Sequence, residues 1–95
     1  MENVDDLTIQ YEDGGEVVTE ELDKKILSKG AWATVLFKYR DRRKDGWTPT
    51  KYRICRYRKM NGVYRQQAKF NISSDAQARN LSEALIAWAD ENAEA

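Results

Sequence analysis

The sequence contains no histidine, one proline and one cysteine among its 95 residues. Without histidine the commonest general base is missing, and catalytic triads or metal sites that use an imidazole are excluded. The single Cys55 can form neither an internal disulfide nor a thiolate zinc site, so we expect a small buried apolar residue there. The sequence therefore predicts a protein that is not an enzyme and has no cofactor and no metal.

Long apolar runs are also missing. No stretch of about eighteen apolar residues occurs, and the first residues lack the basic and then apolar segments of a secretion signal. These features predict a soluble, cytoplasmic protein without a membrane partner. A chain of this length with 41% apolar residues should form a single core. We expect residues 1–16 to be an acidic N-terminal tail or edge strand, and residues 17–95 to form one domain.

The charge that is present is segregated along the chain. Residues 1–23 carry nine carboxylates and no Lys or Arg, which gives a net charge of −9. Residues 31–70 carry twelve bases and two carboxylates, for a net charge of +10, and residues 71–95 return to −4. The formal net charge of the whole chain is zero, but the basic middle segment predicts a surface that attracts an acidic polymer.

The clearest local signal is the start of a helix at Ser74. Ser74 and Gln77 have the spacing of a capping box. An apolar stripe follows at spacings of three and four, formed by Ala78, Leu81, Leu85 and Trp88. We expect this stripe to pack on a sheet, whereas Ile86 lies off the stripe and should be either exposed or part of a subunit contact.

Strands are predicted before this helix. The Asn61-Gly62 pair is the strongest hairpin signal, because a type I′ turn needs positive φ at both central residues, and it predicts strands over 50–60 and 63–72. Alternation of apolar residues predicts another strand over 31–40. Residues 17–28 fit helical and strand spacing, and we favour a strand. The predicted fold is α+β, an antiparallel four- to five-stranded β-meander followed by one C-terminal amphipathic helix.

A two-residue turn at Asn61-Gly62 also predicts the register of the hairpin. Arg58 should lie opposite Arg65, an unfavourable pairing of like charges by about 0.2–1 kcal/mol unless an anion lies over them. We expect the helix to cover the more apolar face and leave the basic face open. The basic face should carry Tyr52, Ile54, Arg56, Arg58, Arg65, Gln67, Lys69 and Asn71, and the core face Lys51, Arg53, Cys55, Tyr57, Tyr64, Ala68, Phe70 and Ile72.

Basic residues interleaved with aromatic residues are typical of proteins that bind single-stranded nucleic acid. Such proteins combine a positive groove for phosphates with rings on which bases stack, each stack contributing on the order of 1–3 kcal/mol. The alternatives are a solvated sheet face, or a protein interaction module that uses the basic face or an open sheet edge. The predicted nucleic-acid-binding residues are Lys38, Trp47, Lys51, Tyr52, Arg53, Arg56, Arg58, Arg65 and Lys69.

Two short motifs carry a family resemblance. Residues 45–54 (DGWTPTKYRI), followed by a basic strand, residues 69–73 (KFNIS) and the amphipathic helix, resemble the positive-cofactor-four-like transcriptional coactivators, particularly their small bacterial members. The similarity spans roughly residues 31–91. It implies homodimers whose curved four-stranded sheets bind single-stranded DNA without strong sequence preference.

The resemblance also implies positions for individual residues. It places Trp47, Lys51 and Arg53 on the side that meets nucleic acid. The expected partners are single-stranded DNA or RNA, with DNA favoured, and a second copy of the chain. We expect the dimer contact at Ile86 and Trp88, because an open basic face leaves only helix ends or sheet edges for assembly.

Overall fold

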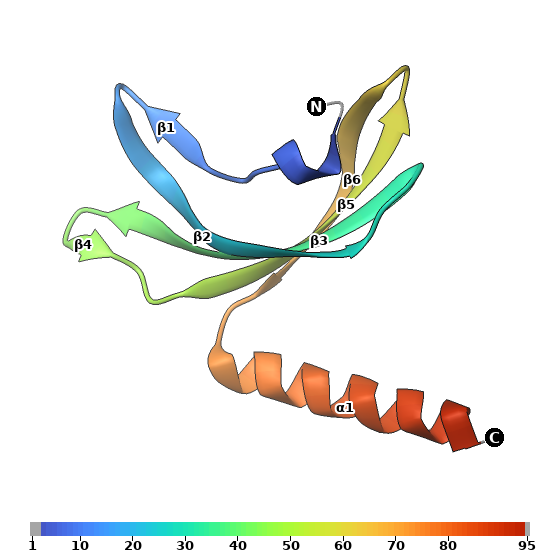
Figure 1. The fold of residues 1–95 in the computed structure, drawn as a ribbon. Coiled ribbons are helices and arrows are strands. Elements are labelled where there is room, and N and C mark those ends of the chain that lie inside the picture. The colour runs from blue at the N-terminus through green and yellow to red at the C-terminus, as the bar shows by residue number, and fades with distance from the viewer. Residues whose placement is uncertain (1–2, 95) are drawn as a thin grey trace.

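The computed structural model describes residues 3–94 and contains a six-stranded antiparallel sheet followed by one long helix. The strand order is β1-β2-β3-β5-β6, and β4 pairs only with β3. This arrangement confirms the predicted α+β meander with a C-terminal helix (Figure 1). The elements are the 3₁₀-helix η1 (Val4–Asp6), β1 (Tyr11–Asp13), β2 (Glu16–Ser28), β3 (Trp32–Arg43), β4 (Gly46–Trp47), β5 (Lys51–Met60), β6 (Val63–Ile72) and α1 (Asp75–Glu94).

The strands agree with the sequence patterns that predicted them. The ambiguous residues 17–28 lie within β2, so the strand interpretation is confirmed. Asn61 and Gly62 have φ values of 54° and 80°, as a type I′ turn requires. Strand β3 continues beyond its predicted end at residue 40, because its last residues pair with β4.

The sheet curves into a trough, and its two faces are covered differently. Figure 1 shows the N-terminal segment inside the trough and α1 below the convex face. The core lies on the concave face, where Val35, Phe37 and Cys55 are fully buried and pack with Val4 and Leu7 of the N-terminal segment. The expectation that the helix covers this face is wrong, because the acidic start of the chain supplies the apolar cover.

Helix α1 begins as predicted but packs over only part of its length. The Gln77 N–H donates to Ser74 Oγ at 3.1 Å, and the Ser73 N–H donates to Gln77 Oε1 at 3.0 Å. Leu85 and Trp88 are 53% and 62% exposed, so the predicted packing of the whole stripe on the sheet is wrong. Within residues 3–94, no helix combines the length and apolar character needed to span a lipid bilayer.

The β5–β6 hairpin follows the predicted register only near its turn. Arg58 lies opposite Arg65, as expected. Gln67 is then an extra residue on β6, so that Arg56 pairs with Ala68 and not with Gln67. A bulge of one residue inverts the alternation of side chains beyond it. The predicted faces are therefore wrong for residues 68–72: Lys69 and Asn71 lie on the concave face, and Ala68, Phe70 and Ile72 on the convex face.

Candidate nucleic-acid interface

One end of the convex face holds a tryptophan with three arginines on neighbouring strands, which we call the Trp32 cluster (Trp32, Arg56, Arg58 and Arg65). The guanidinium carbons of Arg56 and Arg58 lie 4.6 and 5.3 Å from the centre of the Trp32 ring. Trp32 pairs with Arg58 across β3 and β5, and Arg58 pairs with Arg65 across β5 and β6. Directly opposite residues share a face of the sheet. Trp32 remains 41% exposed, so solvent reaches a ring that the arginines flank.

The arginines of this cluster have no carboxylate partner among residues 3–93. The ion pairs in this part of the chain join Arg40 to Glu20, and Arg43 and Lys51 to Asp41. Arg56, Arg58 and Arg65 are exposed. Like charges directly opposite each other are unfavourable, and an anion placed over them removes the repulsion. The Trp32 cluster is therefore a cationic surface that an anionic ligand would stabilise.

A second tryptophan contacts arginines at the opposite end of β3. The guanidinium carbons of Arg40 and Arg42 lie 4.2 and 5.6 Å from the centre of the Trp47 ring. Arg40 Nε also lies 2.7 Å from Glu20 Oε1, which neutralises much of its charge locally. Trp47 is half-buried. This predicted site residue thus belongs to a more covered and less cationic environment than Trp32.

Three of the predicted binding residues lie on the concave face. Lys51 Nζ lies 3.3 Å from Asp41 Oδ2. The Arg53 guanidinium donates to Asn71 Oδ1 at 2.7 Å and to the Tyr39 hydroxyl at 3.2 Å, and it stacks 4.7 Å from the centre of the Tyr39 ring. Lys69 lies directly opposite Cys55. The structure therefore does not bring these residues together with Arg56, Arg58 and Arg65.

Lys38 and Tyr52 lie opposite each other on the convex face, near the start of α1. The Tyr52 hydroxyl donates to Asp75 Oδ1 at 2.8 Å, and this hydrogen bond raises the pKa of the Tyr52 phenol. Tyr52 therefore ties β5 to the first residue of the helix. Lys38 is exposed, and its ammonium group is accessible to an anion from the convex side.

Trp32 is the residue of this surface that the sequence patterns did not identify. The alternation of apolar residues predicted a strand that includes Trp32. It did not predict the contact of Trp32 with Arg56 and Arg58, because that contact depends on the pairing of β3 with β5. Among the side chains of residues 3–93, no three Cys, Asp or Glu groups gather closely enough to hold a metal ion. Searches found no matching family model, no similar curated protein and no similar solved structure.

Proposed function

We propose that this chain binds single-stranded nucleic acid through the convex end of its sheet. The observation that carries the proposal is the Trp32 cluster: an exposed indole ring contacted by Arg56 and Arg58, with Arg65 opposite Arg58, and no ion pair of these arginines within residues 3–93. Guanidinium groups contact phosphate oxygens in a bidentate manner. Any of the bases can stack on an exposed aromatic ring, because every base has a flat π face. DNA is the first candidate because of the family resemblance, which also suggests a role in transcription regulation.

Single strands fit this surface better than a duplex. Stacking on Trp32 requires the flat face of a base, and in a duplex those faces are covered by neighbouring base pairs. A single strand exposes them without the cost of unstacking, which amounts to a few kcal/mol. Arg56 and Arg58 would then contact the phosphates on either side of the stacked base.

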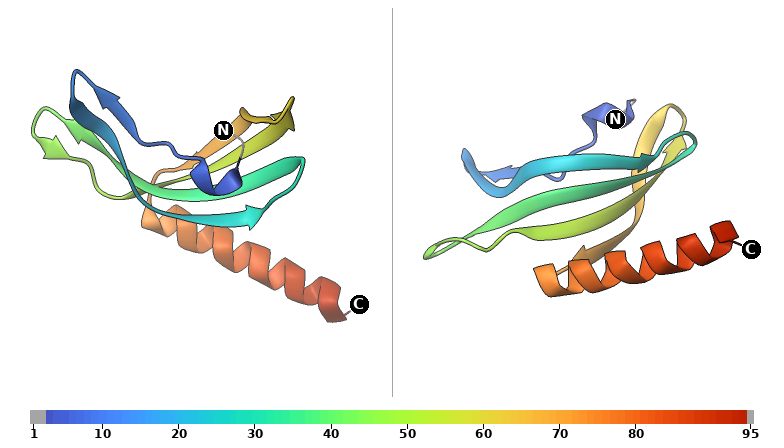
Figure 2. Two further views of the ribbon diagram at one scale, coloured as in Figure 1. Left: turned by 45° about the horizontal axis from the view of Figure 1, so that its top comes forward. Right: turned by 60° about the horizontal axis from the view of Figure 1, so that its bottom comes forward.

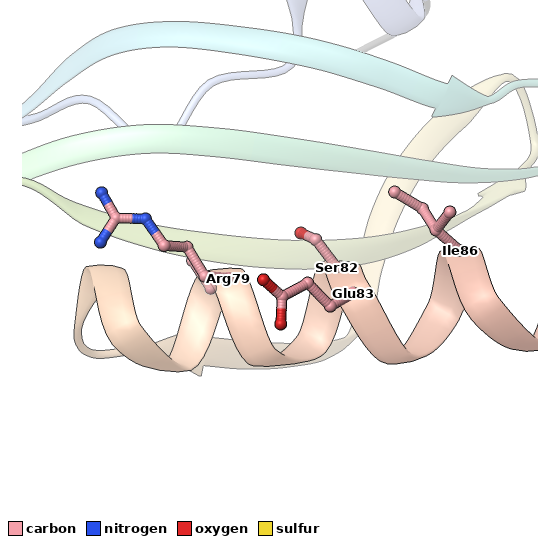
Figure 3. Close-up of a pocket in the computed structure, with 5 residues that line it drawn as sticks. Arg79, Ser82, Glu83 and Ile86 are labelled. Carbon is pink, nitrogen blue, oxygen red and sulfur yellow. The ribbon is translucent and has the colours of Figure 1, made fainter.

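We also propose that two copies of the chain associate through the helix. The space between α1 and the convex face is a hollow of about 400 Å³ lined by apolar side chains that include Leu27, Ile54 and Leu85. Ile86 and Trp88 are 61% and 62% exposed on the second half of the same helix. The close-up in Figure 3 shows Ile86 on the side of α1 that also carries Arg79, Ser82 and Glu83.

The chemistry of this surface favours a second copy as its cover. Contact between the exposed Ile86 and Trp88 of two copies would bury apolar side chains of both helices and leave the basic convex end of each sheet open to nucleic acid. Two Trp32 clusters held in one dimer would bind one strand with a gain in effective concentration. Ile86 and Trp88 are the proposed contact residues.

A protein partner is the alternative ligand, and one feature favours it. Strand β6 is the last strand of the sheet, so its outer edge has no partner in residues 3–94. Such an edge can pair with a strand of another chain. If the ligand is a protein strand, oligonucleotides should not bind more tightly as their length increases.

The proposal is tested by fluorescence anisotropy with labelled single-stranded and double-stranded oligonucleotides of increasing length at two salt concentrations. We expect tighter binding of the single strands, quenching of tryptophan fluorescence and weaker binding at the higher salt concentration. An acidic peptide of similar charge is the control for simple charge attraction. Flat curves for every oligonucleotide at low salt would refute the proposed function.

A further inference from the structure

The N-terminal strap, defined as residues 3–10, lies in the trough without belonging to the sheet. The left view of Figure 2 shows it over the concave side. The pairing of β1 with β2 begins only at Tyr11. Val4 and Leu7 are the buried residues of the strap. They are three positions apart across one 3₁₀ turn, and this spacing points both side chains toward the same surface.

Lys24 and Glu21 of β2 hold the strap by hydrogen bonds. Lys24 Nζ donates to the carbonyl oxygens of Asp5 and Leu7 at 2.5 and 2.7 Å. The Glu21 N–H donates to Oε1 of the Gln10 side chain at 3.0 Å. The Thr8 hydroxyl donates to a Glu21 carboxylate oxygen at 2.6 Å. The strap is therefore held by two buried apolar side chains and by hydrogen bonds to its backbone, as bound peptides are in many recognition domains.

The floor and rim of the trough define what it accepts. The floor is apolar and consists of Val35, Phe37, Cys55 and Tyr57. Lys24 contacts the strap from β2, and Lys69 lies on the same face opposite Cys55. The strap carries Asp5 and Asp6 between its two anchors, and both are exposed. The strap that lies on this floor is itself acidic and has apolar side chains three residues apart, so a segment of the same kind is the expected ligand.

We propose that the trough is a peptide-binding surface, occupied here by the chain's own strap, that accepts an acidic segment of another protein with apolar residues at positions i and i+3. The strap has no backbone ladder to the sheet, so it can open while the strands stay paired. Because the strap is tethered, it competes with the incoming segment at a high effective concentration. The trough lies on the opposite face from the Trp32 cluster, so this proposal does not depend on nucleic-acid binding.

The first experiment uses the full-length Leu7→Asp variant, in which a charge at an anchor position releases the strap. A labelled peptide with the sequence of residues 1–12 is titrated into the variant and into the wild type. We expect the variant to bind the peptide at least about tenfold more tightly than the wild type, because only the wild type retains an intact competing strap. A peptide that carries the same Leu7→Asp change should bind neither protein. A folded variant that does not bind the wild-type peptide would overturn the proposal.

The second experiment uses the wild type and does not depend on the folding of the variant. The Asp6 and Leu7 amides donate within the strap, to Asn3 O and Val4 O at 3.0 and 3.2 Å. We expect these two amides to exchange with solvent deuterium at least about tenfold faster than the amide of Phe37 in β3, and faster again with excess peptide. Equal rates for strap and β3 would show that the strap opens only when the sheet unfolds, and would overturn the proposal.

Discussion

Replacing Arg56, Arg58 and Arg65 together with alanine tests the proposed binding surface most directly. Two of these arginines contact one exposed ring, and the third lies opposite one of them. None has an ion-pair partner in residues 3–93, so each is available to one phosphate. A phosphate contact on a single strand contributes about 0.7 to the slope of log K against log salt, and three contacts contribute about 2.1. Between about 50 and 200 mM salt, the wild type should therefore lose about 18-fold more affinity than the variant.

The assay is an anisotropy titration of a labelled single-stranded oligonucleotide at several salt concentrations. The matched control is the triple alanine variant of Lys59, Lys69 and Arg79, which removes the same charge. Lys59 contacts Tyr64 and Lys69 lies opposite Cys55, so both are on the concave side of the same hairpin, whereas Arg79 is on the helix. An unchanged slope in the first variant, or an equal decrease in both variants, would refute the assignment of the surface.

Three further predictions concern single residues. Trp32→Ala should weaken single-strand binding by about 1–3 kcal/mol at fixed salt while the salt slope stays unchanged; a titration in which only the slope changes would contradict a stacking role. Burial raises the pKa of the Cys55 thiol, so a thiol reagent should react slowly until denaturant is added. As the pH rises, the thiol of the unfolded chain ionises before that of the folded chain. The free energy of unfolding should therefore be unaffected below the ordinary pKa of 9.0 and fall as the pH rises above it. Ile86→Asp should shift the monomer–dimer equilibrium toward the monomer by several kcal/mol, as measured by light scattering. A wild type that is monomeric at high protein concentration would refute the proposed dimer contact at Ile86.

The features that the sequence predicted correctly are those fixed by neighbouring residues. The turn at Asn61-Gly62 follows from the backbone freedom of those two residues, and the helix start follows from Ser74 and Gln77. Strand β2 was predicted because its pattern had to turn directly into β3. Each of these signals acts over a few positions and does not depend on the rest of the fold.

The features that were missed depend on residues far apart in the sequence. An acidic segment reads as solvent-exposed, yet Val4 and Leu7 cover Phe37 from about thirty positions away. The contact between Trp32 and Arg56 requires β3 and β5 to be neighbours in the sheet. In the sequence the short strand β4 lies between these two strands, so their pairing is not evident from strand order alone. The hairpin register placed Lys51 and Arg53 on the core face, whereas the resemblance placed them on the side that meets nucleic acid. The structure agrees with the register for these two residues, so the predicted binding residues lie on two surfaces.

The extra residue Gln67 has a consequence for how this hairpin tolerates change. Its side chain is exposed, so most substitutions there should be neutral. Its presence, however, allows Tyr64 to face the concave core while Phe70 and Ile72, an even number of positions away, lie on the convex face. Removing the residue would turn one of these two groups toward the wrong side. The chain length at this point is therefore constrained even though the identity of the amino acid is not, and insertions or deletions here should be far more harmful than point mutations.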